Sequence, residues 1–288
     1  MKRLYEILRG IQNFMLYYNG EKAVFFHDDK KLTSKKYNYL CRMCKMAGIE
    51  FLFHDSNRNR LYFKTPDGIF FTTNDYYNVS IEVFVRKTYS LPVIPELNND
   101  FCVFDIGMNR AYTTLFFANQ EKCKAVFSFE IDENTFSFAQ ENINLNPLLS
   151  SKIQVFNYGL SNENKEINLF SSIQYDGHTS IIQEHCGNEA VNIKKAQVRK
   201  ASEVFAAIFN NDNCPKAKVL KIDCEGAEYE IFEDLAKANL IDEFSVIIGE
   251  IHYGMKQIPS LLSNFDLVNI NQQTDFLMNV CYVNKKCL

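Results

Sequence analysis

The chain has 288 residues, and 47% of them are hydrophobic, which is enough for a sizeable buried core in one large domain or two smaller ones. A formal net charge of −4 excludes a strongly basic protein that binds nucleic acid through its surface charge. No window is a long, uncharged apolar run, so we expect no membrane span.

The N-terminal region predicts short helices and one β-hairpin. Residues 1–18 have the pattern of an amphipathic helix, with charges among the apolar residues. A signal peptide lacks such charges in its apolar part, so we expect a cytoplasmic protein. A second helix is expected over 34–47 and a third over 80–91. Between them, two aromatic-rich runs flank the turn residues of segment 66–68, which predicts a β-hairpin.

A linker is expected over residues 92–100, which contain two prolines and adjacent asparagines. It predicts two domains, 1–97 and 98–288. The first domain would be a small α+β region that serves as a lid or as the contact of a homodimer.

The nine cysteines are an odd number in a chain without an expected signal peptide, which favours reduced thiols over a disulfide framework. Cys41 and Cys44 have the spacing of a zinc-binding pair, and His27 and His54 flank them. No second pair of this kind follows, so we expect packed thiols rather than a zinc site.

After the linker, apolar strand patterns alternate with helical patterns. Strands are expected over 101–107, 125–132, 152–161, 165–171, 219–222, 245–252, 265–270 and 276–283. Helices are expected over 112–119, 133–144, 198–209, 227–235 and 258–264, and a long polar loop over 172–195. This alternation is typical of an α/β fold with a parallel sheet that helices cover on both faces.

The turn after the first of these strands has features of a nucleotide site. Gly107 would let the backbone approach a ligand, and the following helix offers free N–H groups. Glu130 ends the next strand, 25 residues after Asp105, where an acidic residue often reaches a ribose hydroxyl. The glycines that a pyrophosphate needs are missing, so a smaller adenosine ligand fits better. The alternative is that Glu130 is a solvated strand end.

Acidic residues and a histidine follow two later strands. Asp223 ends the strand 219–222, and Glu250 and His252 end the strand 245–252. If these strands are neighbours, the side chains meet in one crevice. They could bind Mg²⁺ or Mn²⁺, or His252 could act as a base without a metal. The structural alternatives are a Glu250–Lys221 pair and a helix-capping role for His252. Glu228 and Glu230 also fit an acidic helix start.

Residues 101–252 resemble the FkbM-type family of S-adenosylmethionine-dependent O-methyltransferases. The matching segments, in the family's order, are FDIGMNRAYTTLFFA, FSFEID, VFNYGLSN, DGHTSI, VLKIDCEGAEYEIFEDL and VIIGEIH. The most specific part runs from Lys221 to Glu228 and is close to the family's KxDxEGxE. At the first turn the family usually has DxGANxGxYT, whereas this chain has Met108 for the alanine and Ala111 for the second glycine.

The resemblance implies a Rossmann-like sheet of seven mostly parallel strands, one of them antiparallel, and S-adenosylmethionine as the cofactor. The residues that it places around the cofactor are Asp105, Gly107 and Asn109 at the methionine part, Glu130 at the ribose, and Asn157 and Tyr158 near the adenine. It also places His178 near the acceptor. We further predict that Lys221 and Glu225 bind the substrate and that Asp223, His252 and Glu250, at the two strand ends, are catalytic.

The resemblance also implies transfer of a methyl group to a hydroxyl of a sugar or of a polyketide-like scaffold. We prefer a sugar, either nucleotide-activated or part of a surface glycan, because the loop 172–195 is polar and rich in amides. One alternative is a degenerate binding module, which Ala111 would suit. Another is a nucleotide-sugar oxidoreductase, but its Tyr-x-x-x-Lys pair is missing from any suitable helix.

Overall fold

The computed structural model describes residues 24–27, 30–33, 37–172, 179–180, 191–211, 214–274 and 277–288. The chain divides into two compact units, Met1–Lys87 and Thr88–Leu288. Within the described ranges, no helix has both the length and the apolar character needed to cross a membrane. The predicted helix 1–18 and His178 lie outside the described residues.

The first unit contains a three-stranded antiparallel sheet and two helices. The sheet order is β3 (Glu50–Asp55), β4 (Arg60–Lys64) and β5 (Phe70–Thr73), and the helices are α2 (Asn38–Met46) and α3 (Asn78–Phe84). The predicted hairpin is confirmed as β4 and β5, with Gly68 at φ +93° in the turn. Strand β3 was not predicted, nor was the two-stranded ribbon of β1 (Val24–His27) and β2 (Lys30–Thr33).

Cys41 and Cys44 are both buried on α2. Burial raises the pKa of the Cys41 thiol to about 12 and raises the pKa of the Cys44 thiol as well. This agrees with the expectation of packed thiols.

The second unit is built on a seven-stranded sheet in the order β15-β16-β14-β13-β6-β7-β8. The strands are β6 (Phe101–Ile106), β7 (Cys123–Phe129), β8 (Ile153–Phe156), β13 (Ala217–Ile222), β14 (Val246–His252), β15 (Phe265–Gln272) and β16 (Leu277–Asn284). β16 alone runs opposite to the other six strands of this sheet. The predicted α/β class and the mostly parallel Rossmann-like sheet are therefore confirmed.

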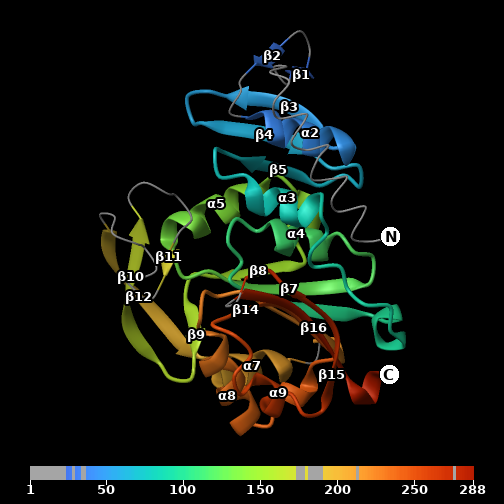
Figure 1. Cartoon of the computed structure of the whole chain (residues 1–288), viewed down its shortest axis with the longest axis vertical. Helices are drawn as coiled ribbons and strands as arrows, with labels where there is room; N and C mark the ends of the chain where they lie inside the picture. Colours follow the sequence, from blue (N-terminus) through green and yellow to red (C-terminus); the bar gives the residue numbers. More distant parts are fainter. Residues whose placement is uncertain are drawn as a thin grey trace. The chain divides into compact units, whose positions relative to one another are not determined.

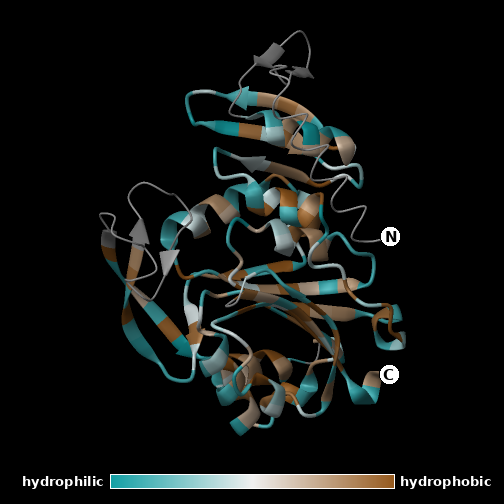
Figure 2. Ribbon diagram, in the orientation of Figure 1, coloured by the Kyte–Doolittle hydropathy of each residue, from teal (hydrophilic) through white to brown (hydrophobic). Residues whose placement is uncertain are grey.

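Helices cover both faces of this sheet (Figure 1). On one face lie α4 (Tyr112–Ala118) and α5 (Glu133–Asn144), with the short α6 (Pro147–Ser150) after them. On the other lie α7 (Ala201–Phe209), α8 (Glu228–Lys237) and α9 (Ile258–Leu261). The middle strands carry mostly hydrophobic residues (Figure 2), as expected for strands buried on both faces.

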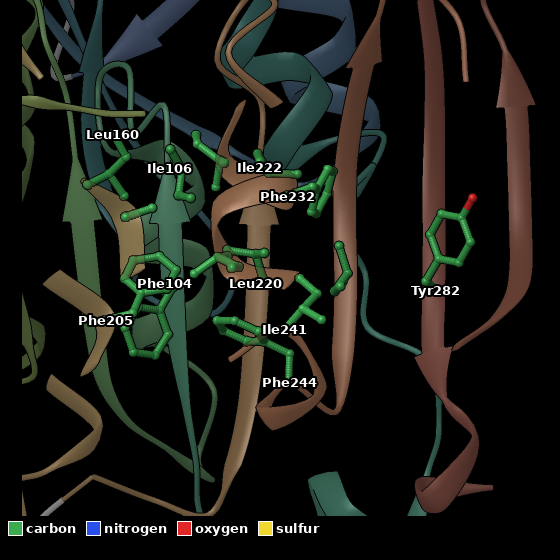
Figure 3. Packing of buried hydrophobic residues seen from close by; sticks show 14 of the residues in the cluster. Phe104, Ile106, Leu160, Phe205, Leu220, Ile222, Phe232, Ile241, Phe244 and Tyr282 are labelled. Carbon is green, nitrogen blue, oxygen red and sulfur yellow. The ribbon is translucent and has the colours of Figure 1, made fainter. Parts of the chain in front are cut away.

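The core on the α7–α9 side is aromatic. The ring centroid of Phe104 on β6 lies 4.7 Å from that of Phe205 on α7 and 5.6 Å from that of Phe244 (Figure 3). Phe232 of α8 and Ile222 of β13 are fully buried in the same cluster. These contacts hold α7 and α8 against β6 and β13, the two strands whose ends form the candidate site.

A second sheet extends from the edge of the unit, in the order β11-β10-β12-β9. Its strands are β9 (Gly159–Ser161), β10 (Lys165–Ser172), β11 (Thr179–Ser180) and β12 (Val191–Lys200). The prediction of a loop to 195 and a helix from 198 was therefore wrong, because 191–200 form a strand and α7 begins at Ala201. Polar residues dominate β12, and its side chains from 193 to 200 are buried only at Val198, so it lacks the apolar pattern of a core strand.

Candidate active site

The site lies where the carboxyl ends of β6, β13 and β14 come together. β13 pairs in parallel with β6 on one side and with β14 on the other. The Asp223 N–H donates to the Ile106 carbonyl over 3.1 Å, and a Cβ on Gly107 would lie 1.8 Å from the Asp223 carbonyl oxygen. Gly107 also has φ +74°. Only glycine fits there, and it lets the turns after β6 and β13 touch.

A buried ion pair lies beneath these turns. Lys221 Nζ is 3.1 Å from Asp105 Oδ1, and the side chains are 2% and 0% exposed. Lys221 also donates to the carbonyls of Ile106 and Gly107 at 3.2 and 2.7 Å. Burial opposes its charge, but the Asp105 and Asp223 carboxylates outweigh burial and raise the pKa of Lys221. Lys221 therefore supports the turn from below, and we assign it that role instead of the predicted contact with substrate.

Asp105 is held on its other oxygen by Thr114 of α4, whose hydroxyl donates to Oδ2 over 2.7 Å. The sequence left open an ion pair between Lys221 and Glu250, but in the structure Lys221 pairs with Asp105. Glu250 instead accepts a 2.8 Å hydrogen bond from Asn279 on the neighbouring strand β16. Asp105 is fully buried, so it shapes the turn that carries Gly107 and Asn109.

Glu130 organises the predicted cofactor side. Its Oε2 accepts from the Asn109 N–H at 2.8 Å, and its Oε1 accepts from the Asp132 N–H at 2.9 Å. The amide of Asn157 donates to the Glu130 carbonyl at 2.9 Å. Burial raises the pKa of the Glu130 carboxyl to about 7, although the two backbone hydrogen bonds favour the carboxylate and lower the pKa. The structure thus brings together three of the predicted cofactor residues.

Tyr158 lies next to this group and is half-buried. Its ring centroid is 5.8 Å from that of Phe129 at the end of β7. The guanidinium of Arg199 on β12 lies 4.2 Å from the centre of the Tyr158 ring. This cation–π contact attaches the second sheet beside the predicted adenine position.

His252 forms a carboxylate–imidazole pair with Glu228. Nδ1 of His252 lies 2.9 Å from Glu228 Oε1, which also accepts from the Cys224 N–H at 3.0 Å. Glu228 is fully buried, and its Oε2 finds no hydrogen-bond partner among the described residues. Burial favours the neutral imidazole, but Glu228, Glu225 and Asp223 together raise the pKa of His252 to about 9.

The role of Glu228 was missed from the sequence, where it was assigned to a helix start. A usable signal was present, because Glu228, Ile231, Phe232 and Leu235 share one helical stripe and all four are buried on α8. An acid on an apolar stripe is buried, and a buried acid needs a partner. That partner is His252.

Asp223 and Glu225 face the other side of the imidazole. His252 Nε2 lies 3.5 Å from Glu225 Oε2. The Glu225 side chain is exposed, and its backbone is left-handed, with φ +56°. Atoms of Asp223, Glu225 and His252 that could bind a metal lie within 4.8 Å of one another. Glu250 is not in this group, so the arrangement differs from the predicted trio of Asp223, Glu250 and His252. Asp223 and His252 do meet, as predicted.

Residues 105–277 match the model of the methyltransferase FkbM domain. The chain belongs to the FkbM methyltransferase family.

Curated relatives of this FkbM chain are distant. "Methyltransferase 1" of Beauveria bassiana is 24% identical over 169 residues, which cover 54% of this chain and 65% of the relative. The hexuronic acid methyltransferase AglP of Haloferax volcanii is 24% identical over 192 residues, which cover 65% of this chain and 73% of the relative. The chain thus spans slightly less than two thirds of the fungal protein's length.

A crystal structure of methyltransferase FkbM from Methylobacillus flagellatus is similar, with 15% identity and a TM-score of 0.42. The match covers 65% of this chain and 44% of that one.

The two departures of this chain from the FkbM pattern lie in the buried turn before α4. Ala111 has φ +64°, a left-handed conformation that suits the glycine of the family pattern and strains an alanine. Met108 is buried and packs in one cluster with Ala111, Ala139 and Ile143. The turn has a left-handed backbone at Gly107, Asn109 and Ala111.

Proposed function

We propose that the chain is an S-adenosylmethionine-dependent O-methyltransferase that acts on a sugar hydroxyl. The observation that carries this proposal is the Glu228–His252 pair beside Asp223. The Asp223 backbone contacts the Gly107 turn, whose Asn109 N–H donates to Glu130. A base and a cofactor loop within one crevice suit transfer to a hydroxyl. The sugar preference is supported by the relative named a hexuronic acid methyltransferase.

The residues of the Glu130 turn fit the cofactor. Each Glu130 oxygen accepts one backbone N–H and keeps a further lone pair, as a ribose with two hydroxyl donors requires. Asn109 and Gly107 would lie against the methionine part, and Asn157 and Tyr158 against the adenine. When bound, S-adenosylmethionine supplies a methyl group on a positively charged sulfur.

On the acceptor side, His252 Nε2 would accept the hydroxyl proton. Glu228 holds Nδ1, fixes the ring orientation and stabilises the imidazolium that forms, in the way a buried carboxylate supports a catalytic histidine. The carboxylate of Asp223 would accept a hydrogen bond from the acceptor and align its oxygen with the methyl carbon. Glu225, on the exposed rim, would contact the acceptor.

The assigned base predicts a pH dependence. Because the pKa of His252 is raised to about 9, the imidazole is mostly protonated at neutral pH and cannot accept a proton. We expect kcat/KM to rise about tenfold per pH unit from pH 6 and to level off near pH 9. Initial rates between pH 6 and 10 test this, and a flat profile would exclude His252 as the base.

The proton on His252 also affects stability, which should fall over the pH range in which activity rises. A pKa raised from 6.5 to about 9 on folding stabilises the protein fully below pH 6.5, and this contribution is lost as the pH rises through 9. At most it amounts to roughly 3 kcal/mol. Urea unfolding of the wild type and of His252→Ala over the same pH range provides the control, because the variant should lose this part of the pH dependence.

Metal-assisted transfer with Mg²⁺ or Mn²⁺ on Asp223, Glu225 and His252 is the second candidate mechanism. A metal on this side of the ring must displace the proton that His252 holds up to about pH 9. We therefore expect activity to survive dialysis against EDTA with less than a twofold loss. Loss of activity that Mg²⁺ or Mn²⁺ restores would establish the metal mechanism instead.

The proposal is tested by methyl transfer to a fixed panel of sugars: UDP-glucose, UDP-N-acetylglucosamine, UDP-glucuronic acid and the methyl glycosides of the same three sugars. A product heavier by one methylene is the expected result with at least one member. Calorimetric titration with S-adenosylmethionine separates the alternatives, because binding without transfer to any acceptor would favour a degenerate binding module. Binding of NAD instead would favour an oxidoreductase.

A further inference from the structure

Tyr89 lies outside the residues that match the family model, yet it contacts the candidate site. It precedes β6 by a short connecting segment and belongs to the same compact unit as the sheet. Its side chain is 5% exposed, and its hydroxyl donates to Asp223 Oδ2 over 3.0 Å. A segment that precedes the methyltransferase core thus supplies a hydrogen bond to a residue at the end of β13.

The tyrosine is held on the buried side of the crevice. The Lys221 ammonium lies 5.5 Å from the centre of its ring, and Lys221 is itself fixed by Asp105. Burial and the Asp223 and Glu250 carboxylates raise the pKa of Tyr89 well above its usual value, so the hydroxyl remains a neutral donor. Its contact with Asp223 is therefore that of a donor to a carboxylate over the working pH range.

A carboxylate at the end of a strand can rotate about its side-chain bonds. The hydrogen bond on Oδ2 fixes this rotation and so sets the direction of Oδ1. Transfer requires the acceptor oxygen to lie in line with the methyl carbon, and small errors of alignment cost much of the rate. A carboxylate that orients the acceptor must itself be oriented.

We propose that Tyr89 is a positioning residue of the methyltransferase site, which holds the Asp223 carboxylate in the direction that aligns the acceptor hydroxyl. This inference rests on the proposed function. It adds a residue from outside the family-matched core to the reacting end of the site.

The experiment compares Tyr89→Phe with Tyr37→Phe in the complete chain. Tyr37 is a matched control, because it is also 5% exposed and its hydroxyl donates to an aspartate, Asp75, over 2.6 Å. We expect Tyr89→Phe to lower kcat by about tenfold to a hundredfold, the effect of losing one hydrogen bond to a charged group. The Kd of S-adenosylmethionine should stay within twofold. Tyr37→Phe should lower the melting temperature and leave kcat unchanged.

The double variant Tyr89→Phe with Asp223→Asn shows whether Tyr89 acts through Asp223. If it does, adding Tyr89→Phe to Asp223→Asn has little further effect on the residual rate of Asp223→Asn. If the two substitutions lowered kcat independently, so that their separate factors multiplied in the double variant, the inference would be overturned. It would also be overturned if Tyr89→Phe kept wild-type kcat on a panel sugar that the wild type methylates. A wild type that methylates no panel sugar would overturn the proposed function and this inference with it.

Discussion

A His252→Ala variant is expected to lose about a thousandfold of kcat while its Kd for S-adenosylmethionine changes less than twofold. General bases contribute about 10²- to 10⁴-fold, and His252 is the imidazole that the structure places beside Asp223 with a buried carboxylate on Nδ1. The cofactor side, around Glu130, contains no part of this pair. Single-turnover transfer and calorimetry measure the two quantities separately.

The control for this variant is Asp234→Asn on α8. Asp234 is also a buried acid of that helix, and its carboxylate accepts a 2.6 Å hydrogen bond from the Ser202 N–H at the start of α7. We expect the control to lose about 1 kcal/mol of stability through the weaker helix cap and to keep its kcat. A His252→Ala enzyme within tenfold of wild-type kcat would show that another group removes the proton.

Replacement of Glu130 is expected to have the largest effect on cofactor binding. Glu130→Ala removes the acceptor for the ribose hydroxyls and leaves the Asn109 and Asp132 N–H groups without their partner. We expect the Kd of S-adenosylmethionine to rise about a hundredfold or more. Because the pKa of Glu130 is raised to about 7, wild-type affinity should also increase from pH 6 to pH 8 as the carboxylate ionises.

Glu133→Gln serves as the control for Glu130→Ala. Glu133 is exposed in the first turn of α5, a few residues further along the chain. Its loss should leave cofactor affinity and the pH dependence unchanged. If Glu130→Ala bound S-adenosylmethionine as the wild type does, the cofactor would lie elsewhere and the assignment of this turn would be wrong.

The fold of the second unit could be predicted because its central strands are mostly apolar. All residues of β6 and β13 are buried, and sequence patterns identify such runs reliably when helices alternate with them. The strands β3 and β12 were missed for the opposite reason. Phe51 is the only buried residue of β3, and Val198 is the only buried one among residues 193–200 of β12. Pairing with another strand, rather than an apolar pattern, makes each of them a strand.

The candidate site could be predicted only in part. Asp223 and His252 end neighbouring strands, so the parallel pairing of β13 and β14 was enough to bring them together. The Glu228 pair depended on the direction of a buried side chain. Tyr89 lies 134 residues from Asp223 in the sequence, and no local pattern connects them.

The most direct test of this account is transfer of the methyl group from S-adenosylmethionine to the sugar panel at pH 9, read by mass. We expect a singly methylated product with at least one sugar for the wild type, and about a thousandfold less for His252→Ala at equal cofactor occupancy. Saturated cofactor binding with no methylated sugar, or equal product from both proteins, would contradict it.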